Sequence, residues 1–252
     1  MLADDAAAYL GQLQKHGVAV LRRVFAPNEL AAVRRAAQAC FEAAEGGSGR
    51  TFPEMYSYNP LSRSVLLAAL QDFGCSLQEL SAPLAIAGLD ALFAAALEGE
   101  VACHLEQAWV RKRYAPFHAP AGYHPNSWHQ DGGLGVRFPA RNGSAIPMTR
   151  LLTCWLPLDL CAGDRPALEF VRRRLDFLLH YSELDDATLR RRFAPGDFWV
   201  PELRLGDGLI FLDGTVHRTY VQPDMPRDRL SIEYRFFLAG VPRCPKGPQT
   251  KE

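Results

Sequence analysis

The chain has 252 residues, 48% of them hydrophobic, and 28 basic residues balance 28 acidic ones, so the formal net charge is zero. This length and composition allow a sizeable buried core, while the neutral charge gives no support for long-range attraction to nucleic acid or to an anionic membrane. The six cysteines form no CxxC pair, and neither a secretory signal pattern nor an apolar run of about 18 residues is present. We therefore expect a cytoplasmic protein without a zinc ribbon or a transmembrane helix.

The N-terminal part of the chain predicts mostly helices. A helix is expected over residues 4–15, followed by a strand over 18–25 and a second helix over 27–45. Residues 47–64 are rich in Gly, Ser, Pro and Tyr, which is typical of a loop, and residues 65–98 favour helix again.

From about residue 100 the pattern changes to short alternating or apolar segments. These predict strands within 104–114, 150–160, 167–171, 197–203, 205–220 and 228–240. Helices followed by many short strands predict an α+β chain whose second half is a sandwich or a jelly roll. We expect one domain over residues 1–252, with a mostly helical part at 1–99 and a jelly-roll core at 100–240.

The stretch YHPNSWHQDGG at 123–133 is the first candidate site. In an extended segment His129 and Asp131 point to the same face, because side chains repeat every second residue. Gly132 and Gly133 then allow the chain to turn away. An imidazole and a carboxylate arranged in this way can share a metal ion, but a third ligand is needed from elsewhere.

His217 is the best candidate for the third ligand, because it follows an apolar strand and a turn in GDGLIFLDGTV. Two histidines and one carboxylate occupy one face of an octahedron and leave three positions open, which is the ligand set of non-heme Fe(II) oxygenases. The remaining histidines are expected to be surface, cap or core-edge residues, or neighbours of the site; these are His16, His104, His118, His124 and His180.

A 2-oxo acid that chelates such a metal needs a cation for its far carboxylate, and arginine binds carboxylates with a planar fork. Arg227 and Arg229 lie ten and twelve residues after His217, and spacing alone allows either. In the following strand, polar residues alternate with an apolar face made by Leu230, Ile232, Tyr234 and Phe236.

Taken together, these segments resemble the phytanoyl-CoA dioxygenase family of Fe(II)- and 2-oxoglutarate-dependent oxygenases over most of the chain. The matching stretches are HGVAVLRRVFAPNELAAVRRA, SWHQDGG, LLTCWLPLDLCAGDRPALEFV, GDGLIFLDGTVHRT and RDRLSIEYRF. The resemblance implies a double-stranded β-helix (jelly-roll, cupin-like) core with the N-terminal helices packed outside it.

The resemblance also implies roles for individual residues. His129, Asp131 and His217 resemble the iron ligands. Arg229 resembles the 2-oxoglutarate carboxylate partner, with Arg227 as the alternative. Thr219 stands beside the expected cofactor, and Trp155 is expected either to line the pocket or simply to pack in the core. Residues expected at the substrate entrance are Tyr56, Tyr58, Phe117, His124 and Asn126.

The implied reaction is the oxidation by O₂, with hydroxylation as the expected outcome, of an unactivated C–H bond in a small metabolite or natural-product intermediate. In this reaction 2-oxoglutarate gives succinate and CO₂. The segment PALEFVRRRLDFLLH lacks the PGSH turn of many family members, so a fatty acyl-CoA substrate is not implied. Asp131 favours hydroxylation over halogenation, because halogenating relatives replace this carboxylate with a small residue.

Two alternatives stay open from the sequence. One is a cupin-like metalloenzyme that does not use 2-oxoglutarate, and the other is a non-catalytic jelly-roll binding protein. The sequence indicates neither the substrate nor the oligomeric state.

Overall fold

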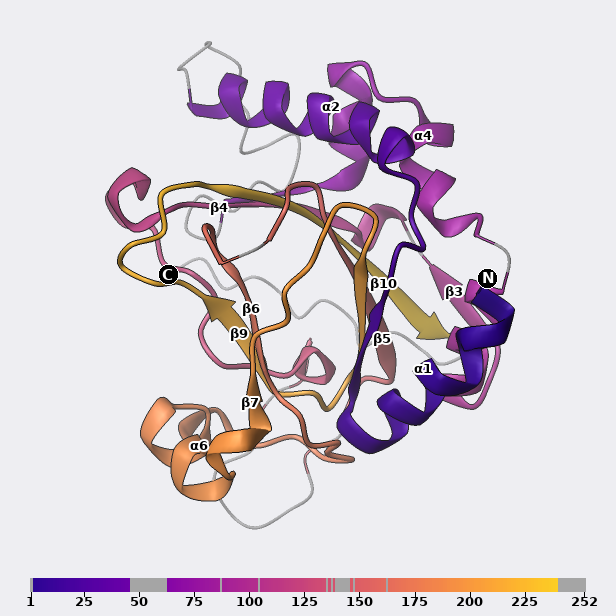
Figure 1. Ribbon diagram of the computed structural model, residues 1–252, viewed down its shortest axis with the longest axis vertical. Coiled ribbons are helices and arrows are strands. Elements are labelled where there is room, and N and C mark those ends of the chain that lie inside the picture. Colours follow the sequence, from indigo (N-terminus) through magenta and orange to yellow (C-terminus); the bar gives the residue numbers. More distant parts are fainter. Residues whose placement is uncertain are drawn as a thin grey trace.

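Figure 1 shows the computed structural model, in which antiparallel sheets are covered on one side by helices. The structure describes residues 2–45, 63–86, 88–103, 105–134, 136, 138, 146, 148–161 and 163–239. Three residues named above, Tyr56, Tyr58 and His104, lie outside these ranges.

The larger sheet has seven strands in the order β1-β8-β5-β10-β4-β2, with β3 also pairing with β10. The smaller sheet has the order β7-β6-β9. Every pairing within the two sheets is antiparallel. The strands are β1 (Val18–Leu21), β2 (Ser64–Leu66), β3 (Val101–Cys103), β4 (Trp109–Arg113), β5 (Leu151–Pro157), β6 (Ala167–Val171), β7 (Phe198–Trp199), β8 (Gly208–Leu212), β9 (His217–Tyr220) and β10 (Arg229–Leu238).

Four of the five α-helices in the described part of the chain come from the first hundred residues, as the sequence predicts. The α-helices are α1 (Leu2–His16), α2 (Pro27–Glu45), α4 (Leu77–Ser81), α5 (Leu89–Leu97) and α6 (Asp186–Arg192). The 3-10 helices are η1 (Leu67–Phe73), η2 (Ala82–Leu84), η3 (Leu105–Gln107), η4 (Pro116–His118), η5 (Asp131–Gly133), η6 (Tyr181–Glu183) and η7 (Pro195–Asp197). No single helix in the described part is long and apolar enough to cross a membrane, and only the bent pair Leu77–Leu84 and Leu89–Leu97 passes that test when counted together.

Two apolar layers hold these elements together, and both follow from strand alternation. In β10 the predicted apolar face, Leu230, Ile232, Tyr234 and Phe236, packs with buried residues of α1, α2, α4 and α5. The opposite face of the larger sheet meets the smaller sheet, where Trp155 of β5 packs with Phe170 of β6 and Phe211 of β8. The polar side chains of β10 therefore point into the space between the two sheets.

Several predicted strands are shorter in the structure. β1 ends at Leu21 because Arg23 takes a positive φ of 53° and its backbone N–H donates to Asp207. Within the predicted strand at 104–114, the described residues form η3 first, and β4 starts only at Trp109. The predicted strand at 197–203 is reduced to Phe198–Trp199, before Pro201, which lacks the N–H that a sheet needs.

Candidate metal centre and cofactor pocket

His129 and His217 are brought together by two backbone hydrogen bonds. The His129 N–H donates to the His217 carbonyl at 2.9 Å, and the His217 N–H donates to the His129 carbonyl at 3.0 Å. Gln130 is extended (φ −127°, ψ 128°), and η5 starts at Asp131. The extended backbone at Gln130 places Asp131 on the same side as His129, which is the geometry predicted from their spacing.

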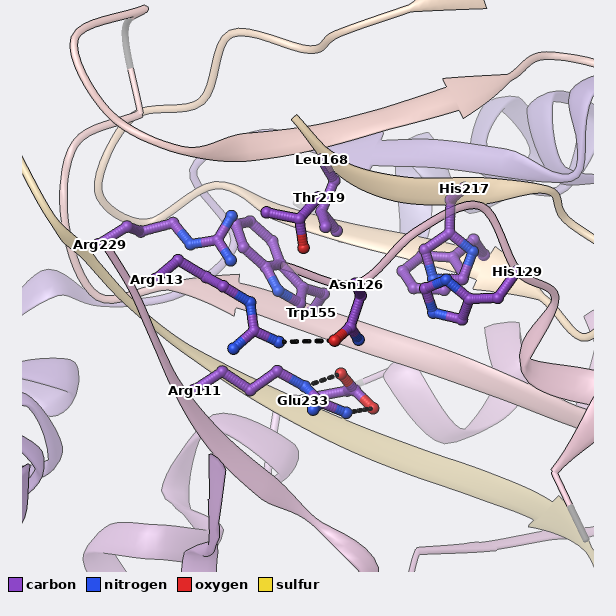
Figure 2. A pocket seen from close by; sticks show the side chains of 11 residues that line it. Arg111, Arg113, Asn126, His129, Trp155, Leu168, His217, Thr219, Arg229 and Glu233 are labelled. Carbon is purple, nitrogen blue, oxygen red and sulfur yellow. Dashed lines mark hydrogen bonds and ion pairs between the residues drawn. The ribbon is translucent and has the colours of Figure 1, made fainter. Parts of the chain in front are cut away.

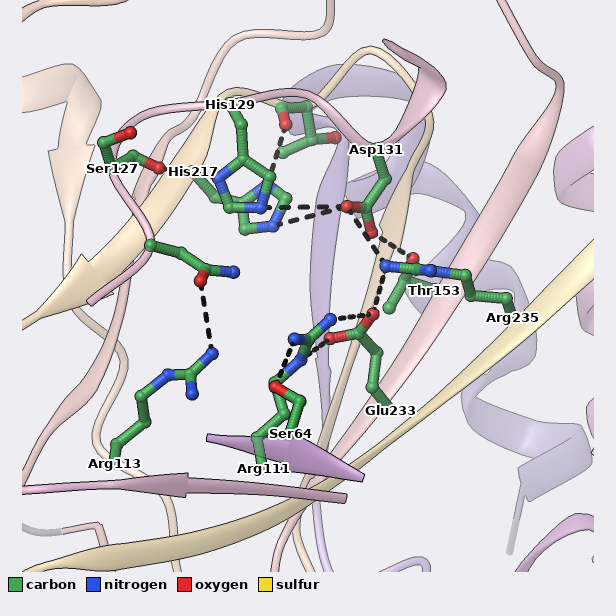
Figure 3. Close-up of polar contacts among 12 residues, drawn as sticks. Ser64, Arg111, Arg113, Ser127, His129, Asp131, Thr153, His217, Glu233 and Arg235 are labelled. Atoms are coloured by element: carbon green, nitrogen blue, oxygen red, sulfur yellow. Dashed lines mark hydrogen bonds and ion pairs between the residues drawn. The ribbon is translucent and has the colours of Figure 1, made fainter. Parts of the chain in front are cut away.

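The three side chains converge at one point, as Figure 3 shows. The Nε2 atoms of His129 and His217 lie 3.8 Å and 4.0 Å from Oδ1 of Asp131. All three potential ligand atoms lie within 4.8 Å of one another. Two ligand atoms about 2.0–2.2 Å from one ion lie at most about 4.4 Å apart. The separations of 3.8 Å and 4.0 Å are below this limit, so the three residues can share a divalent metal.

The protonation of both imidazoles suits metal binding. Nδ1 of His129 lies 2.7 Å from the Ser127 carbonyl, and Nδ1 of His217 lies 3.0 Å from the Thr215 carbonyl. A carbonyl only accepts, so each Nδ1 carries the hydrogen and each Nε2 presents a lone pair. Burial and the neighbouring His217 ring lower the pKa of His129 to about 4, although Asp131 opposes this shift, so the imidazole is neutral at neutral pH.

Asp131 is held as an ionised carboxylate. Burial would raise its pKa, but the Arg235 guanidinium and the His217 ring outweigh burial, and the net pKa lies below its usual range. Oδ2 accepts a hydrogen bond of 2.6 Å from the Thr153 hydroxyl. Oδ1 is therefore the oxygen that faces the two histidines.

Gln130 is a structural residue of the site that the sequence analysis treated only as a spacer. Its buried amide nitrogen donates to the carbonyls of Phe177 (3.0 Å) and Gly214 (2.7 Å), and its oxygen accepts from the Leu179 N–H (2.7 Å). The side chain thus joins the His129 segment to the 177–179 segment and to the turn before His217. No local pattern signals such a role, because its partners are distant backbone groups.

Replacing Gln130 with leucine is expected to lower the free energy of unfolding by about 2–4 kcal/mol, because buried backbone groups lose their partners. Chemical denaturation of the apoprotein measures this change. Gln71 donates only to Ala68 at an exposed site, so Gln71→Leu is the control and should stay within about 0.5 kcal/mol of wild type. Equal stability of the two variants would contradict the prediction.

Gly214, in the turn that leads to His217, has no room for a side chain. A Cβ atom there would lie 1.9 Å from the Leu175 carbonyl oxygen. We expect Gly214→Ala to lower the free energy of unfolding by about 3 kcal/mol, because backbone must move to relieve the overlap. The midpoint of thermal unfolding measures this effect. Gly11 lies in α1 with open space around it, so Gly11→Ala should leave stability unchanged or raise it by up to about 1 kcal/mol.

A pocket lies next to the triad, between the two sheets (Figure 2). It is lined by Arg111, Arg113, Asn126, His129, Trp155, Leu168, Phe211, His217, Thr219, Arg229 and Glu233. Asn126, Trp155, Thr219 and Arg229 are thus predicted site residues that do line it, and Trp155 also packs in the core.

Arg229 is a buried cation whose charge is not balanced by a carboxylate in the described part of the chain. It is 1% exposed, its Nη1 donates to the Pro166 carbonyl at 3.1 Å, and its guanidinium lies 4.8 Å from the centre of the Trp155 ring. Burial lowers the pKa of Arg229. Its Nε and the Trp155 Nε1 are buried donors without a hydrogen-bond partner among the residues that the structure describes. Such orphaned donors fit an acidic ligand, because an anion satisfies both charge and hydrogen bonding.

Arg227 lies elsewhere. Its side chain is 65% exposed and pairs with Asp164 at 3.2 Å. Phe117 and His124 are exposed and do not line the pocket, and their place at the substrate entrance stays a prediction. Both lie on the 115–127 segment, as does Asn126, whose side chain lines the pocket (Figure 2).

The other described histidines are structural or exposed. His180 caps η6 and accepts from the Ser182 N–H, and His16 ends α1 with Nδ1 at 3.4 Å from the Arg172 carbonyl. His118 is half exposed and its Nδ1 lies 3.0 Å from Asp228.

Arg111 and Arg113 on β4 are pocket residues that the sequence analysis missed. Arg113 stands directly opposite Arg229 in the β4–β10 register, and its Nη2 donates to Asn126 Oδ1 at 3.3 Å. Burial and the Arg111 charge lower the pKa of Arg113 to about 9. Two arginines separated by one residue share a strand face. The segment WVRKR therefore predicts that Arg111 and Arg113 point to the same side of the sheet. Only the pairing with β10 shows that this face meets the pocket.

Two imidazoles and a carboxylate beside open space form the ligand set of the mononuclear non-heme Fe(II) oxygenases. The family model described as phytanoyl-CoA dioxygenase matches residues 13–220, and the chain therefore belongs to that family of Fe(II)- and 2-oxoglutarate-dependent dioxygenases. Among curated protein sequences, none matches the chain.

Solved structures share the fold at low sequence identity. AviO1 from Streptomyces viridochromogenes Tue57 has a TM-score of 0.66 at 19% identity, covering 96% of this chain and 98% of AviO1. EctD from S. alaskensis with bound Fe has a TM-score of 0.64 at 18% identity, covering 92% of this chain and 76% of EctD. The epimerase SnoN, in complex with Fe³⁺, alpha ketoglutarate and nogalamycin RO, has a TM-score of 0.61 at 18% identity, covering 99% and 93%.

Proposed function

We propose that this dioxygenase holds Fe(II) with His129, Asp131 and His217 and binds the far carboxylate of 2-oxoglutarate at Arg229. The observation that carries the proposal is the placement of both features in one small pocket. A triad of two imidazoles and an ionised carboxylate borders it, and so does a buried arginine whose Nε has no partner among the described residues. A ligand that chelates a metal at one end and carries a carboxylate at the other fits this arrangement.

The residues around the pocket supply binding and orientation. Thr219 and Asn126 add polar groups to the wall of the pocket, and Leu168 and Phe211 add apolar surface that limits water. The bound iron and 2-oxoglutarate would supply the oxidising power from O₂, with succinate and CO₂ as products. The protein's own contribution is to keep the C–H bond of the substrate close to the iron.

The proposed reaction is the hydroxylation of an unactivated C–H bond in a small metabolite or natural-product intermediate. The His129 side chain keeps 34% of its surface accessible, whereas that of His217 keeps 5%. We infer that the substrate approaches from the His129 side. Relatives of this fold act on small molecules: EctD has been solved with 2-oxoglutarate and 5-hydroxyectoine, and SnoK is a carbocyclase from nogalamycin biosynthesis.

The two facing sheets support the proposal of a double-stranded β-helix core with the N-terminal helices packed outside it. Strands β1 and β2 of the first hundred residues pair within the larger sheet. This pairing supports a single domain over residues 1–252, since the helical part and the strand-rich part share one core.

The first test is an anaerobic titration of the apoprotein with Fe(II) and then 2-oxoglutarate, followed by visible absorption. A metal-to-ligand charge-transfer band is the expected result, because the keto acid chelates the iron. If Fe(II) binds and no band develops, a cupin-like metalloenzyme that does not use 2-oxoglutarate explains the site better. If no metal binds, a non-catalytic binding protein explains it better.

A further inference from the structure

A row of buried charges lies directly behind the candidate metal ligands (Figure 3). Glu233 and Arg235 follow Arg229 on the same face of β10, and Arg111 reaches them from β4. Arg111 donates two hydrogen bonds to the Glu233 carboxylate, from Nε to Oε2 at 2.7 Å and from Nη2 to Oε1 at 3.0 Å. Its Nη1 also donates to the Ser64 hydroxyl at 2.9 Å. The Glu233 carboxylate is thereby fixed from three strands, β2, β4 and β10.

Arg235 stands between two carboxylates, and it favours one of them. Its Nη2 makes a close ion pair with Oε1 of Glu233, whereas it lies 3.8 Å from Oδ1 of Asp131. That Oδ1 is also the oxygen nearest to the Nε2 atoms of His129 and His217. A metal at the triad and the Arg235 guanidinium would therefore interact with the same oxygen atom, Oδ1 of Asp131.

These charged groups are largely removed from solvent. The side chains of Glu233 and Arg235 are each 9% exposed, and that of Asp131 is 5% exposed. A guanidinium that lost Glu233 would have Asp131 as its nearest remaining carboxylate, since no other described acid forms an ion pair with Arg235. Removing one partner from a buried charge pair leaves an uncompensated charge, which is costly until it finds a new partner.

We propose that Glu233 is a positioning residue that restrains Arg235 and so keeps Oδ1 of Asp131 available to the metal. The inference rests on the proposed function, because it takes Asp131 as a metal ligand. In the absence of Glu233, Arg235 moves onto Asp131 and competes with the metal for its oxygen. Arg235 therefore competes with the metal for Asp131 only when Glu233 no longer holds it. Arg235 itself is not needed for metal binding.

The test measures the dissociation constant of Co(II), added to the apoprotein and followed by its visible absorption, without any turnover. Glu233→Gln keeps the shape of the side chain and removes its charge. We expect it to weaken Co(II) binding by about 10- to 100-fold, the usual effect of losing a residue that orients a metal ligand. The double variant Glu233→Gln with Arg235→Gln should return toward the wild-type value, because the competitor is gone.

A scaffolding role for Glu233 predicts the opposite for the double variant, namely binding at least as weak as in Glu233→Gln alone. That outcome would overturn the proposal, as would wild-type affinity in Glu233→Gln. If Glu233→Gln does not fold, Arg235→Gln alone decides the question. It should bind Co(II) no more weakly than wild type, whereas a tenfold or larger loss, about 1.4 kcal/mol, would show that Arg235 is required.

The matched control is Glu169→Gln. Glu169 is also a buried glutamate, and it pairs with Arg218 at 2.7 Å. Unlike Glu233, Glu169 does not line the pocket, although its neighbour Leu168 does. The Co(II) affinity of Glu169→Gln should equal that of wild type.

His217→Ala separates the proposed function from the inference about Glu233. If this variant binds Co(II) like wild type, the ligand assignment itself fails, and the inference fails with it. If it loses binding while Glu233→Gln does not, only the inference about Glu233 fails.

Discussion

His217→Ala is expected to abolish Fe(II)-dependent turnover of 2-oxoglutarate. His217 is 4% exposed, and its Nδ1 is hydrogen-bonded to the Thr215 carbonyl, so no other atom of this side chain can replace its Nε2 as a ligand. The two ligands that remain come from one short segment, His129 and Asp131. Losing one of three protein ligands should weaken metal binding by more than the roughly 10- to 100-fold that loss of a supporting residue causes.

The measurement is Fe(II) affinity under anaerobic conditions, together with succinate formation. His118→Ala is the control, because His118 is half exposed and pairs with Asp228 outside the pocket. It should retain wild-type metal affinity. Retention of turnover by His217→Ala would remove the main support for the oxygenase function.

Arg229→Met is expected to raise the dissociation constant of 2-oxoglutarate by about 100- to 1,000-fold, which corresponds to the roughly 3–4 kcal/mol lost when a buried charge pair is broken. Methionine fills much of the same space between Trp155 and Pro166, and it removes the charge. Fe(II) affinity should stay close to that of wild type, because Arg229 forms no contact with the triad.

Arg227→Met is the matched control for this experiment. Arg227 is two residues away, is largely exposed and pairs with Asp164 at the surface, where an ion pair contributes little. Its 2-oxoglutarate affinity should match that of wild type. Titration of the charge-transfer band with 2-oxoglutarate measures both variants. A large loss in Arg227→Met with little change in Arg229→Met would reverse the assignment.

Much of the fold could be predicted because it depends on local patterns. The helix over 27–45 appears at the expected residues, and β10 covers 229–238 of the expected 228–240. Strand limits were less predictable. β1 stops at Leu21 only because Asp207, nearly two hundred residues away, binds the backbone of Arg23.

The candidate metal ligands could also be found in the sequence. His129 and Asp131 are spaced to share a strand face, and His217 follows the turn after an apolar strand. The choice between Arg227 and Arg229 could not be made there. Both residues lie at the start of the same alternating segment, and a difference of two positions leaves the strand face unchanged. Burial against Trp155 distinguishes Arg229, and this contact exists only in the folded chain.

The sequence by itself determined the ligand types, their spacing and the two faces of β10, since each depends on chemical identity and on the strand period. Only the tertiary structure decided what surrounds the candidate metal ligands. Arg111, Arg113 and Gln130 belong to the site because strand register and loop packing bring them there. The Arg111–Glu233–Arg235 row behind Asp131 has the same origin. Hydrogen bonds and ion pairs between distant segments have no period along the chain, so they follow only from strand pairing and loop packing in the folded protein.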